Sequence, residues 1–335
     1  PPTLLPAACY PEGVPFNGLD DDCDSDPEDC TLPSTASLGD VGIRWSGQSS
    51  DWAGWAVAGA GDVNADGFDD ALVGAPSGVR SNSAHLLLGG PEPTGGPLGN
   101  AIVYEGPEGN SSVGRAVTGL GDFDGDGVDD FAIGASSWQV DANGIGCAFV
   151  VLGSAEPLGG LISDVAIRYE GSSDDRSGVG SKLSGAGDVN GDGRTDLLVS
   201  AQYWGPTSEA VYGAAYLVLG QATPTTSPLA SAAHIIRGSS ASQLTGASVA
   251  GGGDVDADGL GDFLVGAPYE RDNAGAAYLF LGAAEIADST TDAADACFSS
   301  EAPHMYASHG LAVVGDIDGD GHDDDGDDDD DKDDD

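Results

Sequence analysis

Short apolar runs alternate along this chain with stretches rich in Gly, Pro, Ser and Asp. The first complete set of runs covers residues 54–61, 71–76, 85–89 and 101–106. Val, Ile, Leu, Ala and aromatic residues fill these runs, and no 11-residue window carries the apolar stripe of an amphipathic helix. Short apolar runs bounded by Gly, Pro or Asp are typical of β-strands. The pattern therefore predicts an all-β protein.

The same set of runs recurs along the sequence. Equivalent runs return within residues 114–171, 180–238 and 246–282, and residues 41–47 resemble the last run of a preceding unit. Four short strands per unit predict one four-stranded antiparallel sheet, and sheets repeated around an axis form a β-propeller. We therefore predict a β-propeller of four-stranded blades, incomplete relative to seven blades. A β-sandwich or a solenoid array is the alternative.

The parts of the chain differ in composition, which suggests three segments. Residues 1–40 form an Asp/Cys-rich N-terminal segment, residues 41–324 hold the repeats, and residues 325–335 are almost all Asp. Like charges at such density favour an extended, disordered tail. A disulfide between Cys9 and Cys23 would suit an oxidising compartment, although the sequence leaves the pairing open.

A loop with the pattern D-x-[DN]-x-D-G-x-x-D joins the first two runs of each unit, and a fifth copy follows the last unit. Position 6 is always Gly, which adopts the positive φ of a sharp turn at low cost. Oxygen-bearing side chains at positions 1, 3, 5 and 9 and the main-chain carbonyl at position 7 then surround one point. An all-oxygen site in a flexible loop favours Ca²⁺ over Mg²⁺. The predicted ligands of about four to five calcium ions are Asp62, Asn64, Asp66, Phe68 and Asp70; Asp122, Asp124, Asp126, Val128 and Asp130; Asp188, Asn190, Asp192, Arg194 and Asp196; Asp254, Asp256, Asp258, Leu260 and Asp262; and Asp316, Asp318, Asp320, His322 and Asp324.

Two other interpretations of these loops are weaker. Asp-Gly pairs also make plain hairpin turns, but that role does not require the same oxygen positions in five loops. An EF-hand needs a Glu at position 12 and flanking helices, whereas position 12 is Val73 in the first loop and lies inside an apolar run. We therefore expect each loop to close at position 9 and to bridge two strands as a hairpin. A similar pattern at Asp20, Asp22, Asp24 and Glu28 has Ser25 at position 6, which favours a solvated linker over a sixth site.

The repeated motif resembles the FG-GAP repeat family, which includes the N-terminal propeller of integrin α subunits and many secreted bacterial proteins. The matching sequences are GDVNADGFDDALVGAP at 61–76 and GDVDADGLGDFLVGAP at 253–268. The resemblance covers roughly residues 41–324. It implies a seven-bladed propeller with calcium in hairpin loops on one face, whereas integrin-like ligand binding does not carry over. Four units and a fifth loop cannot close seven blades, and the chain contains no Arg-Gly-Asp. The Phe-Gly of the family is replaced by Gly54-Trp55, Val113-Gly114, Val179-Gly180 and Thr245-Gly246.

Charge and motif content narrow the range of functions. The 57 acidic and 10 basic side chains give a formal net charge of −47, which argues against binding nucleic acid or anionic membranes. No apolar run is long enough for a transmembrane helix. The catalytic signatures of hydrolases, zinc proteases and nucleotide-binding enzymes are absent. We expect a non-enzymatic, secreted or cell-surface, calcium-stabilised scaffold for binding or adhesion, with an unidentified protein or glycan ligand. The alternatives are a lectin, with Trp138 and Trp204 as the candidate sugar contacts, and a module of a polysaccharide-active enzyme.

Overall fold

The computed structural model describes residues 43–77, 82–91, 95–107, 111–138, 145–172, 178–205, 210–300, 302 and 304–313. The chain divides into two compact units, Pro1–Trp45 and Ser46–Asp335. The short strand β1 (Trp45–Ser46) lies at their boundary in the sequence, and all longer strands belong to the second unit. The Cys9–Cys23 pairing, the acidic segment around Asp22 and the fifth loop at 316–324 lie outside the described residues.

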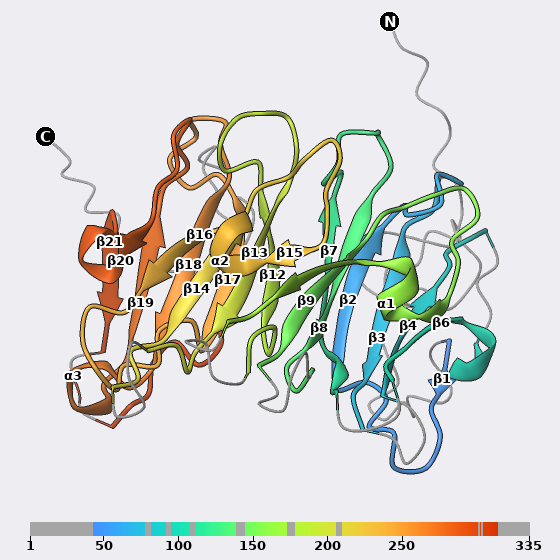
Figure 1. Cartoon of the computed structure of the whole chain (residues 1–335), viewed down its shortest axis with the longest axis horizontal. Coiled ribbons are helices and arrows are strands. Elements are labelled where there is room, and N and C mark those ends of the chain that lie inside the picture. The colour runs from blue at the N-terminus through green and yellow to red at the C-terminus, as the bar shows by residue number, and fades with distance from the viewer. Residues whose placement is uncertain are drawn as a thin grey trace, which may run out of the picture. The chain divides into compact units, whose positions relative to one another are not determined.

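Four antiparallel sheets, one for each predicted unit, stand side by side along the second unit (Figure 1). Within a sheet, each strand pairs with the next one along the chain. We call them sheets 1 to 4 and name the first strand of each the inner strand. Sheet 1 contains β2 (Ala56–Gly61), β3 (Asp70–Ala75), β4 (Ser83–Leu87) and β6 (Ile102–Glu105). Sheet 2 contains β7 (Val113–Gly121), β8 (Asp130–Ala135), β9 (Cys147–Val151) and β11 (Ile167–Glu170). Sheet 3 contains β12 (Leu183–Gly187), β13 (Asp196–Ala201), β14 (Ala214–Val218) and β16 (His234–Arg237). Sheet 4 contains β17 (Ser248–Gly253), β18 (Asp262–Ala267), β19 (Ala276–Phe280) and β21 (Ala296–Ser299).

A fifth, two-residue strand from the following repeat extends the outer edge of sheets 1, 2 and 3. These strands are β10 (Gly160–Leu161), β15 (Ser227–Pro228) and β20 (Ser289–Thr290). Each pairs in parallel with the outermost strand of the preceding sheet, so neighbouring repeats are tied together at their rim. Single helical turns follow these strands: α1 (Ile162–Val165), α2 (Leu229–Ala232) and the 3₁₀ turn Thr291–Ala293. The remaining short elements are β5 (Gly96–Pro97), the 3₁₀ turn Leu98–Asn100 and α3 (Glu270–Asn273).

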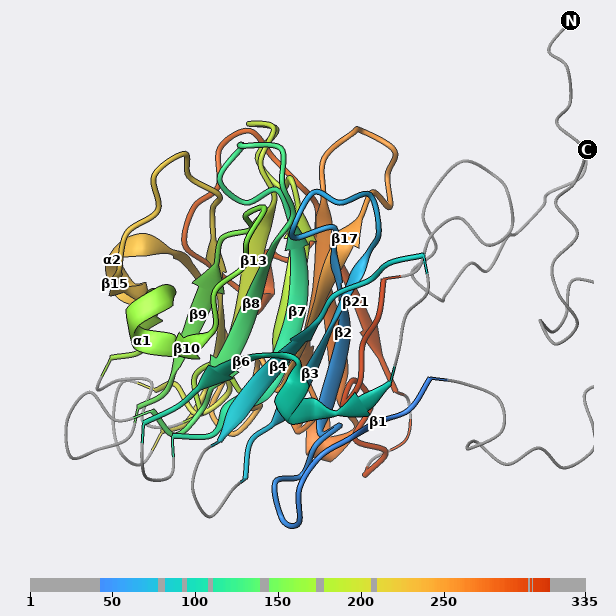
Figure 2. The same cartoon turned by 90° about the vertical axis from the view of Figure 1, so that its right-hand side faces the viewer.

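The hydrophobic core lies in three layers, one between each pair of neighbouring sheets. Figure 2 shows the backbones of these sheets one behind another. Sheet 3 shows how the layers arise, because successive side chains on a strand point to opposite faces. Leu197 and Val199 pack toward sheet 2, whereas Leu198 packs toward sheet 4. A strand that is buried on both faces needs apolar residues at every position. This explains why the sequence contains continuous apolar runs instead of an alternating pattern.

Glycine allows neighbouring sheets to approach closely. A Cβ atom added at Gly74 would overlap the carbonyl oxygen of Gly114 in the next sheet, and one added at Gly134 would overlap that of Gly180. At these glycines the backbones of neighbouring sheets come into direct contact, with no side chain between them. The fold is therefore nearly all β, with sheets of four or five strands arranged as the blades of a partial propeller. Among the described residues, no helix has the length and apolarity to cross a membrane.

Candidate metal centres

The four described acidic loops join the inner strand of each sheet to its second strand. Loops 1 to 4 cover residues 62–70, 122–130, 188–196 and 254–262, and each connects an antiparallel pair. The hairpin connection predicted from the sequence is confirmed, and helices do not flank these loops. The position 6 glycines have left-handed backbones, with φ of 89° at Gly67, 88° at Gly127, 84° at Gly193 and 92° at Gly259. Position 4 is also left-handed, for example at Ala65 with φ of 56°, which the sequence did not reveal.

The aspartate at position 1 organises each loop from within. In loop 1, Oδ1 of Asp62 accepts a hydrogen bond from the backbone N–H of Asp66 at 3.0 Å, and Oδ2 accepts one from Gly67 at 2.8 Å. The same pair of bonds is made by Asp122, Asp188 and Asp254 in their loops. Six residues of chain therefore curl around this carboxylate.

The side chains at positions 3 and 5 also accept backbone hydrogen bonds from within the loop. In loop 2, Oδ1 of Asp124 accepts a hydrogen bond from the N–H of Asp126 at 3.1 Å, and Oδ1 of Asp126 accepts one from Val128 at 2.9 Å. The other three loops repeat both contacts. In loops 2 and 4, each of these carboxylates keeps an oxygen that these bonds do not use, so both loops retain acceptor capacity for a cation.

Carboxylate oxygens converge closely in two of the loops. In loop 2, one oxygen each from Asp122, Asp124 and Asp126 lie within 4.8 Å of one another, and burial together with repulsion from Asp126 raises the pKa of Asp124. In loop 4, Asp254, Asp256 and Asp262 form a similar group, with the aspartate at position 9 in place of the one at position 5. Three anionic oxygens at such spacing fit a hard divalent cation. The acidic clusters of these loops could therefore hold a metal ion.

Loops 1 and 3 carry an amide at position 3 instead of a third clustered carboxylate. Asn64 donates from Nδ2 to Oδ2 of Asp66 at 3.0 Å, and Asn190 donates to Oδ2 of Asp192 at 3.3 Å. In loop 3, Arg194 also makes an ion pair with Asp192 at 3.5 Å. These loops keep the same backbone path as loops 2 and 4 with less negative charge.

Position 9 has a structural role that the sequence did not indicate. Asp70, Asp130, Asp196 and Asp262 are between 0 and 3% exposed. In sheet 3, Oδ2 of Asp196 accepts the N–H of Val189 at 2.9 Å and Oδ1 accepts that of Gly220 at 2.8 Å. The other position 9 carboxylates accept the equivalent bonds, so each one fastens its loop to the end of the third strand. Burial raises the pKa of all four, to about 7 for Asp130 and Asp196.

Loops 1 to 3 are each also bonded to the next repeat. The carbonyl oxygen at position 2 accepts a backbone hydrogen bond from a residue shortly after the third strand of the next sheet. The pairs are Ser154 N to Val63 O at 2.9 Å, Gln221 N to Phe123 O at 3.1 Å and Ala283 N to Val189 O at 2.9 Å. A cation that orders a loop would therefore order the contact between two sheets.

The structure brings together carboxylate oxygens of positions 1, 3 and 5 in loop 2 and of positions 1, 3 and 9 in loop 4. The other predicted ligands, including the main-chain carbonyls at position 7, stay predictions. The tryptophans considered as sugar contacts lie elsewhere. Trp138 is 7% exposed and packs edge-on against Phe149, with 4.9 Å between the ring centres. Trp138 therefore occupies a core position. Trp204 is half-buried beneath the guanidinium of Arg237 at 5.3 Å.

The comparison with family models identifies the class of protein that these sheets and loops form. The model of the FG-GAP repeat matches residues 53–87, 179–218 and 245–280, which span the first three strands of sheets 1, 3 and 4. The chain therefore contains three FG-GAP repeats. Sheet 2 has the same strands and loop although the model does not match it.

The curated relatives are integrin alpha subunits. The chain is 33% identical to integrin alpha-IIb of Homo sapiens over 178 residues, which cover 50% of this chain and 16% of that relative. It is 29% identical to integrin alpha-5 of Xenopus laevis over 190 residues, which cover 54% and 17%. It is 31% identical to integrin alpha-PS2 of Drosophila melanogaster over 169 residues, which cover 46% and 12%. The chain thus spans less than a fifth of the length of these relatives.

Proposed function

We propose that the chain is a calcium-stabilised, extracellular binding scaffold of the FG-GAP type, without enzymatic activity of its own. The observation that carries this proposal is the recurrence of one oxygen-lined loop, with the same inward hydrogen bonds, in all four sheets. Similarity to integrin alpha subunits supports an adhesive or binding role at the cell surface or in the extracellular medium. The ligand would be a protein or a glycan.

Calcium is the metal that the donor set supports best. Side chains at positions 1, 3, 5 and 9 offer carboxylate and amide oxygens, and no His or Cys side chain takes part in loops 1 to 4. Such a hard, multidentate oxygen set suits the larger cation, since Mg²⁺ keeps more of its own waters. The proposed ligands are the residues predicted from the sequence, and the fifth loop would add one more ion. Bound calcium would neutralise the clustered carboxylates and so fix the loops, which are hydrogen-bonded to neighbouring repeats.

Metal content is the direct test of this role. The full chain would be equilibrated with calcium, separated from free metal and analysed by atomic spectroscopy. We expect four to five calcium ions per chain, and about one fewer for each loop that carries Asp→Ala at position 1, such as Asp122→Ala. Replacement of the exposed Asp69, which lies outside the ligand positions, should leave the count unchanged. A content of one ion or none at saturating calcium would contradict the proposal.

An accessory module of a polysaccharide-active enzyme is the second candidate. It differs from the binding scaffold in requiring a partner domain that carries catalysis. The concave, polar site described below, on the side opposite the loops, would favour carbohydrate over protein as the substance bound.

A further inference from the structure

The ends of the inner strands opposite the acidic loops surround a pocket of about 270 Å³. Each inner strand runs from this pocket to its loop, because the loop follows the last residue of that strand. The lining comes from all four sheets. Trp55 directly precedes β2, Arg115 lies in β7, Lys182 directly precedes β12 and Tyr269 follows β18. Residues far apart in the sequence therefore meet at one site.

The described lining of this pocket carries positive charge in a strongly acidic protein. It contains Arg115, Lys182 and His309, and none of the described residues that line the pocket is Asp or Glu, although the chain has a net charge of −47. Three other arginines in the described part of the chain pair with carboxylates: Arg168, Arg194 and Arg237. No such ion pair forms at Arg115 or Lys182 among the described residues. Two cations in a concave site, with no carboxylate partner in the part of the chain that the structure describes, would attract an anionic ligand.

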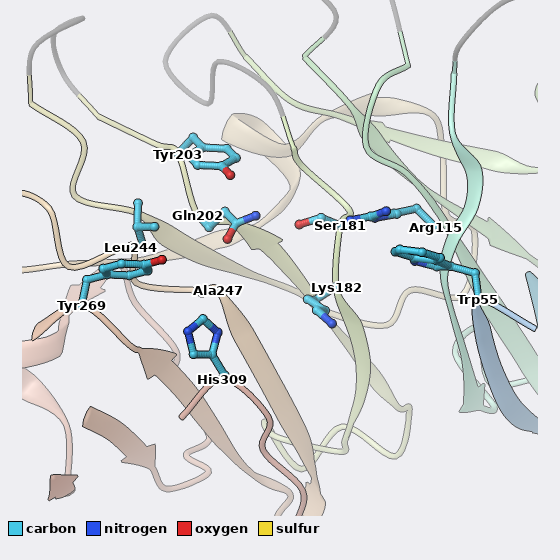
Figure 3. A pocket seen from close by; sticks show the side chains of 10 residues that line it. All are labelled: Trp55, Arg115, Ser181, Lys182, Gln202, Tyr203, Leu244, Ala247, Tyr269 and His309. Carbon is cyan, nitrogen blue, oxygen red and sulfur yellow. The ribbon is translucent and has the colours of Figure 1, made fainter. Parts of the chain in front are cut away.

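Aromatic rings border the two cations. Trp55 is 49%, Tyr203 40% and Tyr269 39% exposed, which is unusual for side chains of this size. The guanidinium of Arg115 lies 4.4 Å from the centre of the Trp55 ring, a cation–π contact that holds this side chain at the pocket wall. Figure 3 shows this pair on one side, Tyr203, Tyr269 and His309 on the other, and Lys182 between them.

The geometry points to a binding site for an acidic saccharide, with a sugar carboxylate between Arg115 and Lys182 and the sugar ring against the aromatic side chains. This inference rests on the proposed function as a binding scaffold and names the class of its ligand. The polar groups of Ser181 and Gln202 also line the pocket and can bond sugar hydroxyls. A concave site of this volume suits a small ring better than an extended acidic peptide, which would favour a longer groove.

Ligand-observed NMR titration of the full chain, in calcium sufficient to fill the loops, tests this inference. The probes are methyl β-D-glucuronide and its neutral counterpart methyl β-D-glucoside. We expect the glucuronide to bind and the glucoside to bind at least about tenfold more weakly, because it lacks the charge-assisted contacts. Lys182→Met should lower glucuronide affinity by at least about tenfold, and Tyr203→Ala should lower affinity without removing the preference for the acid. Arg237→Gln is the matched control, since this arginine lies outside the pocket, and should leave binding unchanged.

Each contrary result has a definite meaning. Equal affinity for the two sugars, or unchanged glucuronide binding in Lys182→Met, would overturn the inference. Binding of a hexaglutamate peptide but neither sugar would also overturn it, in favour of an acidic peptide. Thermal unfolding of the same samples with and without calcium separates this site from the proposed calcium role. Lost calcium stabilisation with intact glucuronide binding would overturn that role alone, whereas a normal calcium effect without glucuronide binding would overturn only the saccharide site.

Discussion

The backbone N–H of Asp62 donates a hydrogen bond of 2.8 Å to Oδ2 of Asp129, although 67 residues separate them in the sequence. Asp62 is the first residue of loop 1, and Asp129 occupies position 8 of loop 2. Between later loops, the N–H at position 8 donates to the carbonyl at position 1 instead, from Thr195 to Asp122 and from Gly261 to Asp188. Neighbouring acidic loops are thus in direct contact, and the proposed cation sites form a connected row.

Replacing Asp129 should loosen the contact between sheets 1 and 2. Asp129→Ala removes a charged acceptor from a partly buried N–H, and we expect a loss of about 1–2 kcal/mol in the free energy of unfolding. Asp69→Ala is the matched control, because it changes the same loop position in sheet 1, where the side chain is exposed. That variant should stay within about 0.5 kcal/mol of the parent. Urea denaturation in the presence of calcium measures the free energy of unfolding of both variants. Equal losses of stability in Asp129→Ala and Asp69→Ala would refute a specific role for Asp129.

The number of carboxylates should rank the loops by calcium affinity. Loops 2 and 4 have aspartate at position 3, and their carboxylates converge in the structure. Loops 1 and 3 have Asn64 and Asn190 there. We expect Asp124→Asn to weaken its site, and Asn190→Asp to strengthen its site, each on the order of tenfold, since ligand charge tunes such sites. Calorimetric calcium titration would detect both changes, and shifts in the reverse directions would show that another factor sets affinity.

Close packing of the sheets makes some glycines irreplaceable. Gly74 and Gly59 belong to the same hairpin, but a Cβ on Gly74 would overlap the backbone of Gly114, whereas a Cβ on Gly59 would meet nothing within 4 Å. We expect Gly74→Ala to destabilise the fold by about 2 kcal/mol or more, because the backbones must separate. Gly59→Ala should change stability by less than about 0.5 kcal/mol. Thermal unfolding of the two variants under one condition gives the comparison, and similar melting temperatures would argue against the close approach.

The buried carboxylates at position 9 predict how stability without metal depends on pH. Burial raises the pKa of Asp130 and Asp196 to about 7 in the folded protein, whereas unfolded aspartate titrates near ~3.9. The folded state therefore binds protons more tightly, and its stability is greatest below about pH 4 and declines as the pH rises toward about 7. Calcium requires the ionised form, so the gain in melting temperature on adding calcium should grow over this range.

Protein freed of metal by dialysis allows this pH prediction to be checked without a chelator whose affinity changes with pH. Melting temperatures would be compared at about pH 4.5 and about pH 7.5, with and without added calcium. Asp196→Asn should reduce the pH dependence, because the amide keeps its size but does not titrate. A metal-free protein that becomes more stable as the pH rises would contradict the raised pKa values.

Much of the fold could be predicted from the sequence because the repeat is local. Each loop motif and the two runs beside it form one hairpin, so the pattern around Asp62 or Asp254 already indicates strand, turn and strand. The rim strand Gly160–Leu161 could not be predicted, since it pairs with Tyr104 and Glu105 of the preceding repeat and its own two residues carry no strand signal. The double role of Asp196 was hidden for a similar reason, because its second partner, Gly220, lies later in the chain, just beyond the end of β14.

The pocket lay beyond sequence reasoning altogether. Trp55, Arg115 and Lys182 come from three different sheets, and only the lateral packing of those sheets brings the residues together. Trp138 stood out in the sequence as a loop tryptophan, but its side chain packs into the core against Phe149. A repeated motif therefore indicated where cations would bind, whereas the position of a ligand site depends on how the repeats assemble.

Calorimetric unfolding of the full chain with and without calcium tests the central claim most directly, since it measures whether the acidic loops need the ion to hold the sheets together. Saturation to ~100 times Kd adds about 2.7 kcal/mol per site, which corresponds to several degrees for a domain of this size. With four loops contributing, we predict that calcium raises the melting temperature of metal-free protein by well over ~5 °C. An unchanged melting temperature at saturating calcium would contradict the account.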